Sequence, residues 1–223
     1  ESSLQAEEQM HSEVFAYMEA DIGMRYGSRE YLKIVRDCKA AVDIPVIASI
    51  NCVSTEWWQD FAAEVAAAGA DALELNVAIM PSSLTVTSEE IEEQYVEIVR
   101  TARAVATIPI AVKLGPYCTS LPKLIIELRQ AGADGFVLFN RFYRPTIDIE
   151  KLDFCVDTPY STSAELSVPL RWICLLADRI ATDFAAATGV HTSDDVVRTI
   201  LAGAKGVQVA SVLYRNGVAE LRN

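Results

Sequence analysis

Two stretches of the sequence, Ala68-Gly-Ala-Asp-Ala-Leu-Glu-Leu-Asn76 and Ala131-Gly-Ala-Asp-Gly-Phe-Val-Leu-Phe-Asn140, share one pattern. In each, Ala-Gly-Ala-Asp comes before a short apolar run that ends in asparagine. A third copy, Ala202-Gly-Ala-Lys205, comes before Gly206-Val-Gln-Val-Ala210. Glycine at this point is typical of the left-handed residue that ends a helix, and the apolar run is typical of a buried strand. The repeat therefore predicts consecutive helix–strand units.

The same alternation of short apolar runs and amphipathic stretches extends along most of the chain. The predicted strands span 46–50, 72–76, 110–114, 135–139, 184–187 and 206–210, and the predicted helices span 28–41, 56–68, 88–106, 120–131, 169–179 and 193–202. Repeated units of this kind favour an α/β fold, the (β/α)₈ TIM barrel, over a doubly wound sheet. A closed barrel needs eight strands. We therefore expect a barrel that lacks its first two strands and its last helix, as the interior of a longer chain.

The whole chain, residues 1–223, is predicted to be a single barrel domain. Residues 1–27 are acidic and lie before the repeats, so we expect a peripheral helix and loop there. Residues 141–168 form a long polar insertion. Long connections on a barrel usually serve as functional lids, which is the role expected for this one.

Composition excludes several classes of function. The chain has 19 basic and 31 acidic residues, a net charge of −12, and 51% hydrophobic residues. Nucleic-acid and membrane-surface binding both need clustered basic residues, so neither is expected. The sequence shows no membrane span or signal peptide, which predicts a cytoplasmic protein. The five cysteines lack the Cys-x-x-Cys spacing and the two histidines lie apart, so no metal site is expected.

Polar residues at the predicted strand ends mark the candidate site, because barrel enzymes carry their active sites at the carboxyl ends of the strands. Ser49, Asn76 and Asn140 lie at such ends, although asparagine also commonly ends a strand for purely structural reasons. Lys113 lies inside the apolar run Ala111-Val-Lys-Leu114. A lysine on a buried strand needs an anionic partner or a functional role, and we favour function.

Two loops of small residues follow the last two predicted strands. Thr188-Gly189 and Ala210-Ser211 can bring backbone N–H groups close to an anion, and barrels often bind phosphate at this position. The first of these loops also precedes a helix. It has a second interpretation as a helix start, capped by Thr192 or Ser193.

From residue 42 to residue 217 the sequence resembles the FMN-dependent dihydroorotate dehydrogenases and their barrel relatives. The resemblance rests on the ordered set 68–76, 108–114, 131–140, 188–190 and 209–211. It implies a (β/α)₈ barrel that binds FMN and oxidises dihydroorotate to orotate in pyrimidine biosynthesis. A pyrimidine-like small molecule is then the expected substrate, and assembly as a homodimer stays open.

The resemblance also assigns roles to individual residues. Asn76, Lys113 and Asn140 match family residues beside the flavin and the substrate, and they are the candidate catalytic residues. In the family, a cation at the position of Lys113 stabilises the charge that develops on the reduced flavin. The candidate cofactor-binding residues are Ser49, Asn76, Lys113, Asn140, Ser163, Thr188, Gly189, Ala210 and Ser211.

One part of the pattern departs from the family. Ile79 stands where the family carries a Cys or Ser base, and Pro81 stands where it carries a substrate-binding asparagine. Arg141 stands where the family has a small hydroxyl residue. Isoleucine cannot accept a proton, and a general base contributes about 10²–10⁴-fold to rate. We therefore expect slow or absent oxidation of dihydroorotate, with Cys52, Ser82, Ser83 and Cys118 as the nearest alternative bases in the sequence.

Two other functions remain open from the residues alone. Lys113 could form a Schiff base, as in an aldolase-type barrel. Alternatively, the chain could be a barrel without catalysis that binds FMN or another phosphate ligand.

Overall fold

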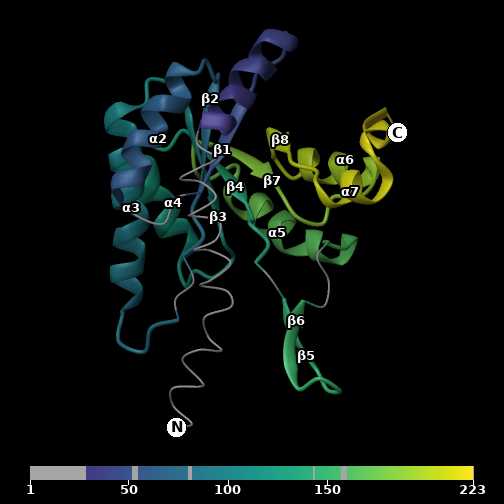
Figure 1. Cartoon of the computed structure of the whole chain (residues 1–223). Coiled ribbons are helices and arrows are strands. Elements are labelled where there is room, and N and C mark those ends of the chain that lie inside the picture. The colour runs from purple at the N-terminus through teal and green to yellow at the C-terminus, as the bar shows by residue number, and fades with distance from the viewer. Residues whose placement is uncertain (1–28, 52–54, 80–81, 143, 157–159, 223) are drawn as a thin grey trace.

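Six parallel strands form one curved sheet, and they follow one another across it in chain order (Figure 1). The structure is a computed structural model that describes residues 29–51, 55–79, 82–142, 144–156 and 160–222. The predicted peripheral segment 1–27 lies outside these residues. The strands are β1 (Ile47–Ile50), β2 (Ala72–Asn76), β3 (Ile110–Leu114), β4 (Gly135–Leu138), β7 (Asp183–Ala186) and β8 (Gly206–Val207). All six predicted strands are present, which confirms a partial (β/α)₈ barrel.

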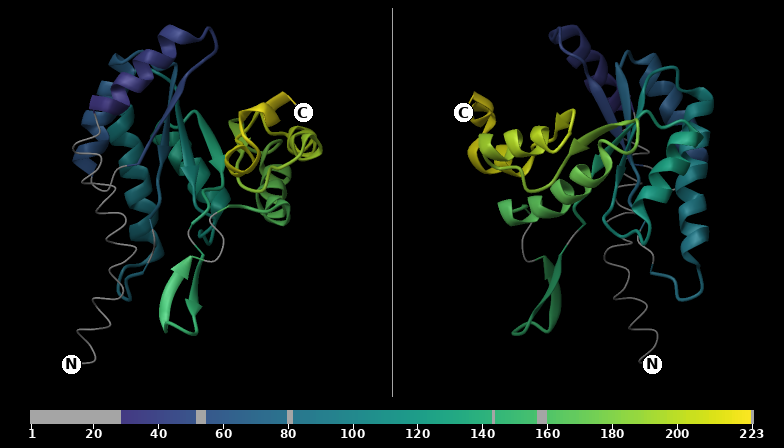
Figure 2. Two further views of the ribbon diagram at one scale, coloured as in Figure 1. Left: turned by 45° about the vertical axis from the view of Figure 1, so that its right-hand side comes forward. Right: turned by 180° about the vertical axis from the view of Figure 1, so that it is seen from behind.

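Helices between the strands cover the outer side of this sheet (Figure 2). Residues 29–41 are helical. They are followed by α2 (Thr55–Ala67), α3 (Ser88–Val105), α4 (Leu121–Ala131), α5 (Ser167–Leu176), α6 (Ser193–Leu201) and α7 (Ser211–Asn216), with two 3₁₀ helices, η1 (Ser163–Leu166) and η2 (Val218–Arg222). None of the described helices is long and apolar enough to cross a membrane.

Strand and helix boundaries differ from the prediction by a few residues. Two elements differ most: α5 spans 167–176 rather than 169–179, and β8 ends at Val207 rather than at residue 210. β8 lies at the edge of the sheet and pairs only with β7, although Gln208 N still donates to Ala186 O at 2.8 Å. The helix start at α6 is settled in favour of Thr192, whose side chain accepts a hydrogen bond from Asp195 N at 3.2 Å.

The Ala-Gly-Ala-Asp repeat ends a helix, as predicted, and also fixes the next strand. Gly132 follows α4 with a φ of +118°, a left-handed conformation that glycine adopts without strain. The aspartates have a role that the sequence did not reveal. Asp134 Oδ2 accepts a hydrogen bond from Ile110 N at 2.8 Å, and Asp71 Oδ2 accepts one from Val46 N at 2.6 Å. Each carboxylate therefore joins its own strand to the start of the preceding one.

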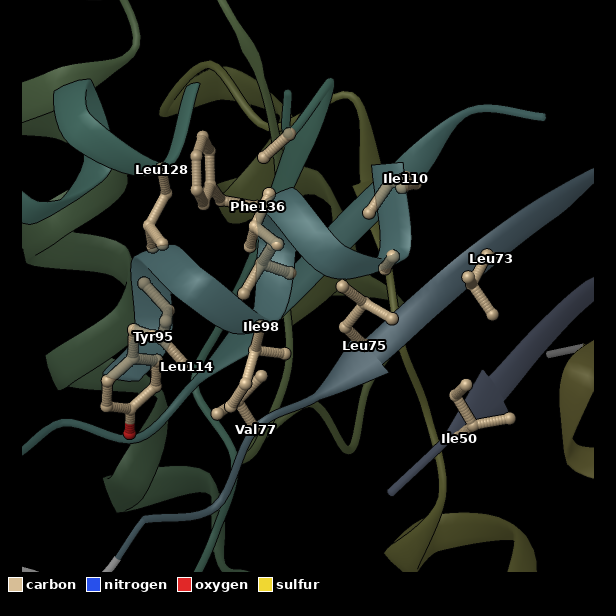
Figure 3. Packing of buried hydrophobic residues seen from close by; sticks show 14 of the residues in the cluster. Ile50, Leu73, Leu75, Val77, Tyr95, Ile98, Ile110, Leu114, Leu128 and Phe136 are labelled. Atoms are coloured by element: carbon tan, nitrogen blue, oxygen red, sulfur yellow. The ribbon is translucent and has the colours of Figure 1, made fainter. Parts of the chain in front are cut away.

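The two faces of the sheet differ in chemistry. Leu73 and Leu75 are fully buried and pack with Ile110 and neighbouring apolar residues beneath the helices (Figure 3). Burying a leucine contributes about 1.5–3 kcal/mol to stability. Because side chains alternate along a strand, Glu74 and Asn76 point to the opposite, concave face. The outer face therefore holds the core, and the concave face is left for polar groups.

The predicted insertion at 141–168 contains a β-hairpin that the sequence analysis missed. β5 (Pro145–Asp148) pairs antiparallel with β6 (Asp153–Val156), and the hairpin projects away from the sheet (Figure 1). Asp148 Oδ1 accepts hydrogen bonds from Glu150 N at 3.0 Å and Lys151 N at 3.1 Å, which shapes the turn. Each strand has only four residues, too few for a clear alternating pattern.

Candidate functional site

Side chains at the carboxyl ends of all six strands of the sheet line one cavity of about 400 Å³. Strand ends of a parallel sheet meet at one edge, which brings together residues that are far apart in the sequence. The cavity lining contains seven of the nine predicted site residues: Asn76, Lys113, Asn140, Thr188, Gly189, Ala210 and Ser211.

Ser49 and Ser163 are not in this lining. Ser49 lies below the cavity in β1, where its Oγ donates to Glu74 Oε1 at 2.7 Å. Asn51, two residues further along the same face, reaches the cavity instead. Ser163 begins η1, and Ser161 is the nearby serine that lines the cavity. In both segments, a residue two positions away from the predicted one lines the cavity.

Lys113 is half-buried and has an anionic partner, as a lysine on this strand requires. Its Nζ lies 3.9 Å from Glu74 Oε1 and donates a hydrogen bond to Gln208 Oε1 at 2.9 Å. Gln208 Nε2 in turn donates to Glu74 Oε2. Glu74 and Gln208 together fix the position of the Lys113 amino group. Sequence reasoning did not identify Glu74 or Gln208, because nothing local links them to Lys113.

The charges in the cavity are of one sign. Lys113 and Arg141 lie in the lining, and no Asp or Glu is among the described lining residues. The whole chain has a net charge of −12. A cavity that offers only cations, within so acidic a protein, favours an anionic ligand.

Asn76 carries an unused acceptor inside the site. Its Oδ1 atom is buried and has no hydrogen-bond partner among the described residues. An unpaired buried oxygen costs about 1–3 kcal/mol unless something donates to it. Because Asn76 lines the cavity, a bound ligand with a donor group could provide the missing hydrogen bond.

Arg141 is held at the cavity wall by the start of η1. Its Nε donates to Glu165 Oε1 at 2.9 Å, and Arg144 Nη2 lies 2.7 Å from the same oxygen. Burial raises the pKa of Glu165, but hydrogen bonds from Arg141 and from Thr162 N outweigh it and hold that pKa below its usual range. Glu165 is therefore a carboxylate at neutral pH, and it joins the loop after β4 to the segment before α5.

The two predicted phosphate loops lie on one side of the cavity. Thr188 has a φ of +73° and its Oγ1 donates to Phe139 O at 2.9 Å, which fixes the first loop. In the second loop, Ser211 Oγ accepts hydrogen bonds from Ser161 N and Ser161 Oγ, both at 3.0 Å. His191 Nε2 also lies 3.0 Å from Ser161 Oγ. Hydroxyl groups and a turn with positive φ thus border the cavity at this end.

None of the alternative bases that the structure describes lines this cavity. Cys118 and Ser83 line a second cavity of about 210 Å³, together with Tyr95. Burial raises the pKa of Cys118, which disfavours its thiolate. Ser82 is exposed, and Cys52 and Pro81 lie outside the described residues. Cys118 therefore faces away from Lys113, because the loop after β3 turns toward α3 on the outer side of the sheet.

No group of three or more histidine, cysteine or acidic side chains among the described residues could hold a metal ion.

Comparisons with known proteins give one consistent result. The family model for dihydroorotate dehydrogenase matches residues 20–222. A putative dihydroorotate dehydrogenase A (fumarate) from Aeropyrum pernix is 30% identical over 203 residues, which cover 88% of this chain and 65% of that protein. The catalytic subunit of dihydroorotate dehydrogenase B (NAD(+)) from Thermoplasma acidophilum is 29% identical over 192 residues, 80% of this chain and 60% of that subunit.

Solved structures agree at the level of the fold. A crystal structure of DHODH from Eimeria tenella in complex with ferulenol matches with a TM-score of 0.60 and 15% identity, covering 86% of this chain and 60% of that one. The chain spans about three fifths of the length of the first curated relatives that it matches. The match of the family model over residues 20–222, together with the barrel strands and their polar ends, shows that this chain belongs to the dihydroorotate dehydrogenase family.

Proposed function

We propose that this chain forms the flavin-binding part of an FMN-dependent oxidoreductase of the dihydroorotate dehydrogenase type, acting on a pyrimidine-like carboxylate. The observation that carries the proposal is the cavity at the strand ends, where Lys113 and Arg141 supply the only charges among the described lining residues. FMN carries a phosphate and dihydroorotate carries a carboxylate, so both are anions at neutral pH. Such a cavity favours both.

The residues present fit a flavin. Asn76 Oδ1 is a buried acceptor that needs a donor, and an isoalloxazine ring carries an N–H group. Lys113 would lie beside the ring, while Thr188, Gly189 and Ser211 would hold the phosphate. When bound, FMN supplies an electron sink that accepts a hydride from the substrate.

The chain's own groups would orient the reactants and exclude water. Lys113 is held in position by Glu74 and Gln208, so its side chain is oriented before any ligand binds. Arg141, fixed by Glu165, would attract the carboxylate of a substrate next to Asn140. Arg141 thus stands where the resemblance leads us to expect a small residue, and it would give this chain a preference for anionic substrates.

Titration of the protein with FMN tests the proposal directly. We expect binding with one FMN per chain, seen as a change in flavin fluorescence, and at least about tenfold weaker binding by Lys113→Met because a cation facing the flavin is lost. Lys123→Met is the matched control. Lys123 pairs with Glu92 and Glu127 on the helical side of the protein, so its loss should leave FMN affinity unchanged. A wild-type protein that does not bind FMN would refute the proposal.

A barrel that binds FMN without turnover is the second candidate. It is favoured by Ile79 and by the position of Cys118 and Ser83, which line the other cavity. A steady-state assay with dihydroorotate, FMN and an artificial electron acceptor separates the two. We expect turnover well below the ordinary enzyme range of about 1–10³ s⁻¹. Turnover within that range would show that a base acts from residues outside those described or from a bound water.

A further inference from the structure

We propose that Glu74 and Gln208 are positioning residues: Glu74 offsets the charge of Lys113, Gln208 fixes its direction, and through Lys113 they set the redox potential of the bound flavin. This inference rests on the proposed function, since it assumes FMN beside Lys113. Neither residue was identified from the sequence. Glu74 lies on β2, the strand next to the β1 edge of the sheet, and Gln208 follows β8 at the other edge. They meet Lys113 on the concave face, where Lys113 and Gln208 line the cavity and Glu74 lies behind them.

The side-chain amide of Gln208 has only one orientation that suits both of its neighbours. Its Oε1 accepts the hydrogen bond from Lys113 Nζ at 2.9 Å, and its Nε2 donates to Glu74 Oε2. If the amide were flipped, its N–H groups would face the Lys113 ammonium and its oxygen would face the Glu74 carboxylate. Both contacts would be repulsive. Gln208 therefore bridges the two charges and holds the ammonium 3.9 Å from Glu74 Oε1, outside hydrogen-bonding distance.

Glu74 makes contacts that a purely structural acid does not need. Asp71 and Asp134 accept hydrogen bonds from backbone N–H groups and so fix strands. Glu74 instead accepts its hydrogen bonds from two side chains of the concave face, Ser49 Oγ and Gln208 Nε2. Only 4% of Glu74 is exposed. Burying a carboxylate costs free energy, and the carboxylate of Glu74 faces the amino group of Lys113.

Two opposite consequences follow for the flavin. Reduction adds negative charge to the ring, so a cation nearby raises the potential and an acid that offsets the cation lowers it. Glu74→Gln keeps the shape of the side chain and removes its charge, so the potential should shift upward. Gln208→Met keeps both charges but removes the bridge, so Lys113 closes on Glu74, away from the ring. The potential should then shift downward, with weaker FMN binding.

The midpoint potential of bound FMN, measured by spectroelectrochemical titration of the FMN-loaded protein, tests this inference. We expect a positive shift for Glu74→Gln and a negative shift for Gln208→Met, relative to wild type. Asp134→Asn is the control, because it removes the same unit charge at the opposite end of the strands. It should leave the potential unchanged. A general loss of structure does not produce shifts of opposite sign, so the pair of variants separates positioning from a role in folding alone.

Each outcome decides the matter. A positive shift for Glu74→Gln with a negative shift for Gln208→Met supports the proposal, and the same two shifts with their signs exchanged overturn it. If wild type and both variants bind FMN with the same potential, or if both variants shift in the same direction, Glu74 and Gln208 do not position Lys113, while the proposed function stands. If the wild type does not bind FMN at all, both proposals are wrong. Where Glu74→Gln fails to fold, a downward shift in Gln208→Met supports the proposal and an unchanged potential overturns it.

Discussion

Replacing Gly189 with alanine should destabilise the protein by about 2–5 kcal/mol. Gly189 has a φ of +85°, and a residue with a side chain loses about 1–2 kcal/mol in that conformation. A Cβ atom added there would lie 2.3 Å from Leu166 N, 2.8 Å from Leu166 Cα and 2.9 Å from the carbonyl carbon of Glu165. These are backbone atoms that cannot rotate away, so overpacking adds about 1–3 kcal/mol.

The overpacking contribution can be measured by comparing urea denaturation of Gly189→Ala with that of Gly69→Ala. Gly69 has a φ of +93° with nothing within 4 Å of the added Cβ, so its replacement should cost only the backbone contribution of about 1–2 kcal/mol. Equal losses at the two positions would refute the argument, because the contact with η1 would then cost nothing. A side chain at position 189 also displaces η1, and with it the Glu165 side chain that binds Arg141. Gly189 variants therefore test stability and not phosphate binding.

Three further outcomes are expected. Lys113→Met should lower the free energy of unfolding by about 3 kcal/mol, because it leaves the buried Glu74 carboxylate without its cation. In thermal melts, the double variant with Glu74→Gln should regain part of that loss. Glu165 has a folded-state pKa below its ordinary value of about 4.3. Its contribution to stability is therefore present above that pH and is lost as the pH falls further. When thermal melts are compared across the acid range, wild type should lose more stability than Glu165→Gln. Burial raises the pKa of Tyr95 to about 12. An alkaline absorbance titration should therefore lose one late-titrating phenol in Tyr95→Phe. A wild-type minus Tyr95→Phe difference titration centred near the ordinary value of about 10 would contradict it.

Local signals in the sequence determined the six strands of the parallel sheet and most of the helices, although not the β5–β6 hairpin. Apolar runs and glycine at helix ends act over a few residues, so they can be recognised without knowing the fold. The same repeats led to a partial barrel, and the barrel rule placed Asn76, Lys113 and Asn140 at strand ends. That much follows from spacing, because the carboxyl ends of parallel strands must meet.

Tertiary structure alone decided which side chains meet inside the site. Gln208 is 134 residues from Glu74 and 95 from Lys113 along the chain, so no local pattern links the three. The curvature of the sheet brings their strands around one concave face, and the same geometry places Ser49 below the cavity. Cys118 was a candidate base by its position after β3, yet its loop turns to the outer cavity. Sequence patterns report the periodicity of one element at a time, whereas hydrogen bonds across a barrel depend on how the strands curve together.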